Sequence, residues 1–223
     1  MSSQPPPEPG EPPPGPVISP AELAELLASA DRPVVLDVRW RLGGPPGIDS
    51  YLAGHLLGCT SDAWLYQLAH VDKLAEQLAS ALPHGTLLLV TADHGMVDVA
   101  NADRTDADTV PGLRDGVVLL GGEARVRHLY CTEGAAADVL ATWRGVLGDL
   151  AWVVSREQAV SDGWFGPVRE ANLARIGDVI VACCGPSAVI ASKTEPRESK
   201  MVGLHGSLTQ AEQLVPLLTF TTG

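Results

Sequence analysis

Asp93, His94 and Gly95 directly follow an uncharged run at residues 86–92. A carboxylate beside an imidazole offers an oxygen and a nitrogen donor, which together suit Zn²⁺ or a similar divalent ion. Gly95 gives the backbone freedom for a sharp turn, so that neighbouring side chains can converge on one ion. The triplet alone is equally compatible with a turn in which Asp93 caps a helix and His94 is solvated.

The run that precedes this triplet is rich in Leu and Val at residues 86–91. Such a run predicts a strand that is buried on both faces of a parallel sheet. Asp93 and His94 then lie at the carboxyl end of that strand, where open α/β sheets bind their ligands. The predicted fold class is therefore α/β, with a mostly parallel sheet flanked by helices.

The other side chains that could do chemistry show no comparable pattern. The four cysteines lack metal-ligand spacing, and the adjacent Cys183 and Cys184 cannot form an ordinary disulfide without strain, so we expect reduced thiols. Arg125 and Arg127 could contact phosphate, although exposed charges on a strand are commoner. Three further histidines are expected to be structural or solvated, namely His70, His84 and His128.

The composition restricts the possible partners. The chain has 223 residues, 45% of them hydrophobic, and a net charge of −12, with a pI near 4.8. This charge argues against nucleic-acid or anionic-membrane partners, because no basic stripe is available to neutralise phosphates. No apolar run is long enough to span a membrane, and no signal peptide is recognisable. We expect a soluble, cytoplasmic protein.

The first 82 residues change character along the chain. Residues 1–16 are dominated by Pro, Glu, Gly and Ser, which predicts a disordered tail. A capping box from Ser19 to Glu22 predicts the start of a helix, and residues 33–40 predict a buried strand. Residues 61–82 predict a long amphipathic helix, because their apolar residues alternate at spacings of three and four.

Four later runs of apolar residues predict strands, at residues 116–122, 125–131, 151–155 and 179–184. Residues 135–147 predict a helix with Val139, Trp143 and Val146 on its inward face. The order strand, helix, strand over residues 125–155 predicts a small α+β insertion.

Two further stretches connect or end these elements. The Asp-rich loop at residues 100–116 is long enough to be functional. Its carboxylates could attract a cation but are more simply solvated. The last helix is expected to be capped by Thr209 and Glu212 and to continue through Leu218.

Residues 34–47 and the segment Tyr51-Leu-Ala-Gly-His55 resemble the start of a two-domain rhodanese, a thiosulfate sulfurtransferase. The resemblance covers residues 17–58. Such enzymes carry sulfur on a cysteine in a Cys-Arg-x-Gly-type loop. None of the four cysteines here lies in that pattern, so a sulfurtransferase activity has no candidate nucleophile.

The later part of the chain contains four short motifs: Thr91-Ala-Asp93-His94-Gly95-Met96, Gly121-Gly-Glu-Ala-Arg125, Arg175-Ile-Gly-Asp178 and Gly203-Leu-His205-Gly206. With them, residues 58–218 resemble the alkaline phosphatase superfamily, in particular its nucleotide pyrophosphatases and phosphodiesterases. The resemblance implies two divalent ions, zinc above all, that stabilise charge on the attacking and leaving oxygens of a small-molecule phosphoester. It also implies a Ser or Thr that attacks phosphorus before water releases the product.

The same resemblance assigns the metal ligands. Asp93 and His94 correspond to ligands of one ion, and His205 and His55 to ligands of the other. Tyr51 stands where the family has an Asp ligand, and a neutral phenol is a poor metal donor. The family's nucleophile lies further towards the N-terminus, where this chain has its rhodanese-like stretch, so the catalytic residue is unknown.

These resemblances divide the chain into a tail (1–16), a rhodanese-like fragment (17–58) and a phosphodiesterase-like portion (59–223), joined near His55. The expected function is metal-dependent hydrolysis of phosphodiester or nucleotide pyrophosphate bonds, impaired because the nucleophile-bearing half is replaced. A rhodanese-like sulfurtransferase and a non-catalytic fusion remnant are the alternatives. An incomplete alkaline phosphatase-like fold would expose sheet edges and apolar surface, which favours self-association.

Overall fold

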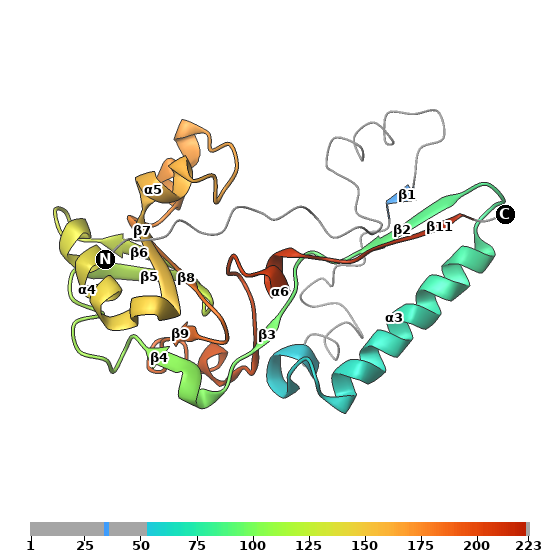
Figure 1. The fold of residues 1–223 in the computed structure, drawn as a ribbon, viewed down its shortest axis with the longest axis horizontal. Coiled ribbons are helices and arrows are strands. Elements are labelled where there is room, and N and C mark those ends of the chain that lie inside the picture. Colours follow the sequence, from blue (N-terminus) through green and yellow to red (C-terminus); the bar gives the residue numbers. More distant parts are fainter. Residues whose placement is uncertain (1–33, 36–52, 222–223) are drawn as a thin grey trace. The chain divides into compact units, whose positions relative to one another are not determined.

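A computed structural model describes residues 34–35 and 53–221 of the chain (Figure 1). These residues belong to two units. The first contains Val34–Val35 (β1), Ala69–Asp93 and residues 215–221, and the second contains residues 53–68 and His94–Leu214. The predicted tail, the helix beginning near Ser19 and most of the rhodanese-like fragment lie outside the described residues. Within the described part, no helix has the length and apolarity needed to cross a membrane.

The first unit contains a sheet with the strand order β1-β2-β11 (Figure 1). β2 spans Leu87–Thr91 and β11 spans Leu217–Thr221. β1 pairs with β2 in parallel, with Val34 opposite Leu88, and β11 pairs with β2 antiparallel along its whole length. The strand predicted at residues 86–91 is confirmed, but its sheet is mixed and only Leu88 and Leu89 are buried.

The chain forms a strand near its C-terminus where the sequence predicted a helix. The last helix, α6, spans only Gln210–Gln213, so the predicted continuation through Leu218 is wrong. Pro216 lacks an N–H group and disfavours helical geometry at the preceding residue. The β-branched and aromatic residues that follow suit a strand paired with β2.

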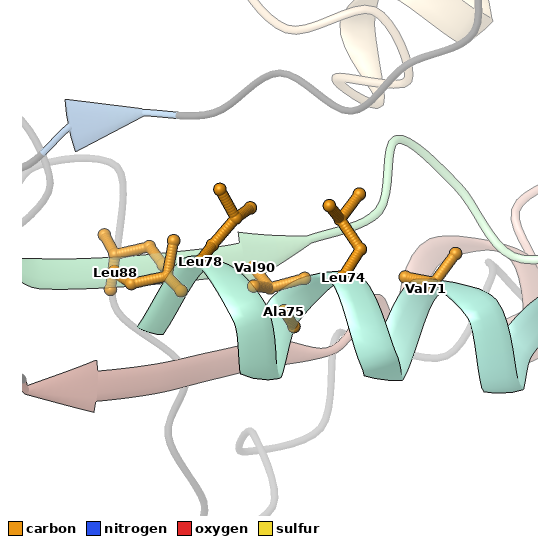
Figure 2. A pocket seen from close by; sticks show the side chains of 7 residues that line it. Val71, Leu74, Ala75, Leu78, Leu88 and Val90 are labelled. Carbon is orange, nitrogen blue, oxygen red and sulfur yellow. The ribbon is translucent and has the colours of Figure 1, made fainter. Parts of the chain in front are cut away.

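The predicted long helix is α3, Asp62–Ala81. Part of it lines a small apolar groove together with β2. Figure 2 shows Val71, Leu74 and Leu78 of α3 beside Leu88 and Val90 of β2. Val71 is 44% exposed and Leu74 is 46% exposed. The helix is thus confirmed, but the burial expected for much of its apolar face is not present among the described residues.

The second unit is built around a four-stranded sheet with the order β5-β6-β8-β7. Its strands are β5 (Val117–Glu123), β6 (Val126–Cys131), β7 (Ala151–Ser155) and β8 (Val179–Cys183). Each neighbouring pair is antiparallel. The four strands were predicted correctly, but the expectation of a mostly parallel sheet is wrong for this sheet, including residues 179–183 of β8. Their complete burial comes from an inner position in an antiparallel sheet, where periodicity gives no pairing direction.

Helices α4 (Ala136–Leu147) and α5 (Arg156–Ser161) contact β7 and β8. Trp143 of α4 is fully buried in the main hydrophobic cluster, and its indole N–H donates to the Leu113 carbonyl oxygen at 3.0 Å. Val139 is also buried, as predicted, whereas Val146 is 41% exposed. Val146 therefore lies outside the inward face that the sequence predicted.

Two short strand pairs complete the second unit. β3 (Val97–Asp98) pairs antiparallel with β10 (Gly203–Leu204), and β4 (Arg104–Asp106) pairs in parallel with β9 (Ala188–Ile190). The short η helices are Ala53–Leu57, Asn101–Asp103, Gly148–Leu150, Glu170–Arg175 and Glu198–Lys200. The α/β class is confirmed. Among the described strands, however, only β1·β2 and β4·β9 pair in parallel.

The Asp-rich loop is built into this unit and is not simply solvated. Asp108 accepts hydrogen bonds from Arg114 and from the backbone N–H groups of Lys193 and Thr194. Asp106 accepts from both the backbone and the hydroxyl of Ser192. These carboxylates connect two loops that are more than eighty residues apart in the sequence.

Candidate metal centre

His55 lies in the π-helical segment Ala53–Leu57 of the second unit and is 5% exposed. Its Nδ1 atom lies 2.8 Å from the carbonyl oxygen of Gly203. A carbonyl oxygen can only accept, so Nδ1 carries the hydrogen. In the neutral ring, the lone pair is therefore on Nε2. Metal-binding imidazoles typically donate their other ring N–H to a carbonyl oxygen in this way.

The surroundings of His55 favour its neutral form. Burial lowers the pKa of His55, because the charged imidazolium loses its hydration. The hydrogen bond to Gly203 and the charge of Glu123 act in the opposite direction, without reversing the shift. A neutral imidazole is the form that binds metal ions.

His94 shows the same backbone anchoring. Its Nδ1 atom lies 2.9 Å from the carbonyl oxygen of Gly95, which leaves Nε2 with the lone pair in the neutral ring. Gly95 also donates its N–H to the carbonyl oxygen of Glu212 at 2.8 Å. The sequence suggested that Gly95 serves a sharp turn, but its φ is not positive. Glycine is required there because any Cβ would collide with the backbone carbonyl of Ala211.

His205 follows β10 and meets both other rings. Its ring stacks on that of His94, with centroids 3.7 Å apart and an interplanar angle of 19°. Its centroid lies 5.5 Å from that of His55, at an interplanar angle of 60°. Gly203 permits this approach, because a Cβ at that position would collide with the carbonyl oxygen of Gly54. Three of the four predicted ligands, His55, His94 and His205, are therefore brought together.

The pair His55 and His205 fits one shared divalent ion. Two imidazoles on one zinc ion have ring centres about 5 Å apart, since each Zn–N bond is about 2.0–2.1 Å long. The resemblance assigns His94 and His205 to two neighbouring ions, whose separation in such sites is about 3.5–4 Å.

The described residues include no group of three or more His, Cys, Asp or Glu side chains arranged to hold a metal ion. Asp93, the fourth predicted ligand, is exposed and ends the Ala69–Asp93 segment of the first unit. Tyr51 lies outside the described residues. Imidazole nitrogen is a donor type that suits divalent ions, and Asp93 stays a predicted ligand.

A sequence profile of the type I phosphodiesterases / nucleotide pyrophosphatases matches residues 47–208, well over half of the chain. The chain belongs to this family. The motifs that contain Asp93, Arg125 and His205 all lie within the matched region.

Solved structures of other proteins have the same fold as this chain. Murine ectonucleotide pyrophosphatase / phosphodiesterase 5 (ENPP5) is 18% identical, with a TM-score of 0.62, and the match covers 90% of this chain and 51% of that protein. An inactive variant of murine ENPP5 in complex with AMP gives a TM-score of 0.63 at 18% identity, with 91% and 51% coverage. This family member thus spans about half the length of these solved relatives.

The N-terminal region has a different relative. A stretch of 42 residues is 50% identical to SseB of Mycobacterium tuberculosis, whose name describes a thiosulfate sulfurtransferase. The match covers 19% of this chain and 15% of SseB. It supports a local resemblance only.

The structure corrects the interpretation of the two arginines. Arg125 and Arg127 are buried, with side chains 0% and 2% exposed, and pair with Glu212 and Glu195. They are neither exposed strand charges nor available to a phosphate. Arg125 belongs to one of the four motifs, so the sequence singled it out. Its partner Glu212 could not be identified from the sequence, because 87 residues separate the two.

The remaining candidates are structural. His128 accepts a hydrogen bond at Nδ1 from the N–H of Gly177, while His70 and His84 are exposed. Burial raises the pKa of Cys59 to about 12 and that of Cys183 to about 11, which suppresses thiolate formation at neutral pH. The cysteines are free thiols, as predicted.

Proposed function

We propose that this protein binds divalent metal ions and hydrolyses phosphodiester or nucleotide pyrophosphate bonds. The observation that carries the proposal is the meeting of His55, His94 and His205 in a chain of the phosphodiesterase family. The AMP complex of murine ENPP5 supports a nucleotide-containing substrate. Zinc is the proposed metal, because imidazole nitrogen and carboxylate oxygen both suit it.

In this proposal, His55 and His205 hold one ion, and Asp93 and His94 hold the other. Bound ions of this kind stabilise negative charge on the attacking and leaving oxygens of a phosphoester. The chain's own contribution is to orient the rings. The carbonyl oxygens of Gly203 and Gly95 fix the Nδ1–H tautomers of His55 and His94, and the lowered pKa of His55 keeps that ring neutral.

We further propose that turnover by this chain is weak. The family attacks phosphorus with a Ser or Thr located N-terminal to the matched metal ligands, and the rhodanese-like stretch occupies that place here. Tyr51 also replaces a carboxylate ligand. Metal binding and slow hydrolysis are therefore the expected pair of properties.

The test measures bound zinc and the release of nitrophenol from bis(nitrophenyl) phosphate, with added Zn²⁺ or Mn²⁺. We expect about one to two ions per chain and slow, metal-dependent turnover. His205→Ala should abolish turnover and lower zinc binding, whereas His84→Ala, at an exposed histidine outside the site, should leave both unchanged.

Other outcomes favour the alternatives. Zinc binding without turnover would identify a non-catalytic metal-binding remnant, and absence of both would reject the proposal. Thiocyanate formation from thiosulfate and cyanide, lost on replacement of one cysteine, would favour the sulfurtransferase. The SseB match supports this second candidate function, sulfur transfer.

A further inference from the structure

The second unit contains a buried ion pair that none of the preceding functions uses. The side chains of Arg125 and Glu212 are 0% and 1% exposed. Arg125 donates from Nε to Glu212 Oε1 at 2.8 Å and from Nη2 to Oε2 at 2.7 Å. This two-point geometry defines the position of the carboxylate as well as its charge.

Glu212 uses the same carboxylate to hold the segment that carries His205. Oε1 accepts the backbone N–H of Ser207 at 2.9 Å, and Oε2 accepts the hydroxyl of Thr209. Ser207 is only two residues from His205, and its hydroxyl donates to the Cys183 carbonyl oxygen at 2.6 Å. The path of the backbone after His205 is therefore anchored on Glu212 and on β8.

The main chain of Glu212 is connected to His94 through Gly95. Its carbonyl oxygen accepts the N–H of Gly95 at 2.8 Å, and the carbonyl oxygen of Gly95 lies 2.9 Å from Nδ1 of His94. Glu212 is thus connected by hydrogen bonds to the segments that carry both members of the stacked pair, His94 and His205. A displacement of Glu212 would move both rings.

Arg125 in turn connects Glu212 to the loop between β8 and β9. Its Nη1 atom donates to the carbonyl oxygens of Gly185 and Ser187, at 2.8 and 2.6 Å. Removal of one partner from a buried ion pair leaves the other charge without compensation, so the surrounding segments must rearrange. The arrangement is therefore sensitive to the shape of the arginine head group.

We propose that Arg125 and Glu212 are positioning residues, which set the relative placement of the His94 and His205 imidazoles. For metal binding, this inference rests on the proposed function. For ring placement, it stands on the hydrogen bonds alone.

Arg127 of β6, two residues after Arg125, offers a matched comparison. It is equally buried, pairs with Glu195 and donates to the Val189 and Gly122 carbonyl oxygens. Its hydrogen bonds go to none of the segments that hold His94 or His205. Arg127→Lys therefore makes the same chemical change in a similar environment.

The experiment compares Arg125→Lys, Glu212→Gln and Arg127→Lys with the unmodified protein in full-length form. Long-range ¹H–¹⁵N spectra of the metal-free proteins report the ring environment and tautomer of each histidine. Zinc affinity is measured by competition with a chromogenic chelator, and circular dichroism monitors folding. Thr209→Val, which removes one hydroxyl contact to Glu212, provides a milder change if a charge variant does not fold.

We expect Arg125→Lys and Glu212→Gln to shift the His94 and His205 ring signals and to weaken zinc binding at least about 10-fold. Thr209→Val should shift His205 more than His94, and Arg127→Lys should leave both rings unchanged. Unchanged ring signals in folded Arg125→Lys or Thr209→Val would overturn the inference, as would an equal effect of Arg127→Lys. If the rings shift but the unmodified protein binds no zinc, positioning is supported and the proposed function fails.

Discussion

Gly95 shows how a single residue decides the packing beside His94. The backbone carbonyl of Ala211 approaches so closely that no side chain can be accommodated, and the Gly95 N–H bonds to the next residue, Glu212. Gly203 serves a similar purpose opposite Gly54. Both glycines allow segments that are distant in the sequence to approach through their backbones.

Gly95→Ala should destabilise the protein by at least about 2 kcal/mol, because the added Cβ must displace the backbone of Ala211. Gly145→Ala is the control: it lies in α4, nothing lies within 4 Å of its added Cβ, and it should stabilise by about 0.5–1 kcal/mol. Urea unfolding monitored by circular dichroism measures both. A neutral Gly95→Ala would show that the contact is absent.

Asp108 makes the free energy of unfolding depend on pH in the acid range. Burial acts to raise the pKa of Asp108, but hydrogen bonds from Thr194, Arg114 and Lys193 outweigh it and lower the pKa to about 2. The ordinary value is 3.8, so the folded state binds this proton less readily than the unfolded state. The stabilisation is complete above the ordinary pKa and is lost as the pH falls from there towards 2.

Asp108→Asn should therefore cost about 2 kcal/mol at pH 7, through lost charge-assisted hydrogen bonds. It should cost much less near pH 2, where the carboxyl of the unmodified protein is also becoming neutral. Urea midpoints at the two pH values measure the difference. Asp115→Asn, at an exposed position, should have little effect at either pH. An equal loss from Asp108→Asn at both pH values would contradict the assignment.

At the scale of elements, α3 carries more apolar surface than its described neighbours cover. Exposed apolar side chains extend along it, and the groove that it forms with β2 is lined by apolar residues alone. β11, at the edge of the β1-β2-β11 sheet, adds an uncharged strand with exposed Leu218 and Phe220. Exposed apolar faces and unpaired strand edges favour association.

We expect concentration-dependent self-association of the unmodified protein, and Leu74→Lys should shift it towards monomer. The added charge would have to be desolvated in any contact made by this face. Gln77→Lys, at an exposed polar position of the same helix, is the charge-matched control. Sedimentation velocity over a range of concentrations measures the effect. A monomer at all concentrations would rule out this expectation.

At the scale of the whole molecule, acidity dominates the long-range electrostatics. The net charge of −12 repels phosphate backbones and anionic lipid head groups, particularly at low ionic strength. The same charge attracts cations towards the chain. We therefore expect metal ions to be better partners than polyanions.

The unmodified protein should bind neither duplex DNA nor phosphatidylserine vesicles at low salt. Fluorescence anisotropy of labelled DNA and vesicle flotation measure this. A basic DNA-binding protein serves as the positive control. Saturable binding that weakens as salt rises would disprove the expectation, since it would reveal a basic surface.

The sequence by itself determined most of the elements, the motifs and the family. Strand and helix periodicities depend on neighbouring residues, so β2, α3 and α4 could be predicted from local pattern. The same reasoning failed at α6 and β11, where pairing with β2 prevailed over an apparent helical pattern.

Tertiary structure alone decided which distant groups meet. His55 and Gly203 are 148 positions apart, and Arg125 and Glu212 are 87 apart, so no local pattern could reveal either contact. Strand direction also depended on pairing, which made the largest sheet antiparallel. By resemblance, the motifs predict His55, His94 and His205 to be metal ligands. Only the fold could bring their rings together, because burial and hydrogen bonding are settled between segments that the sequence keeps far apart.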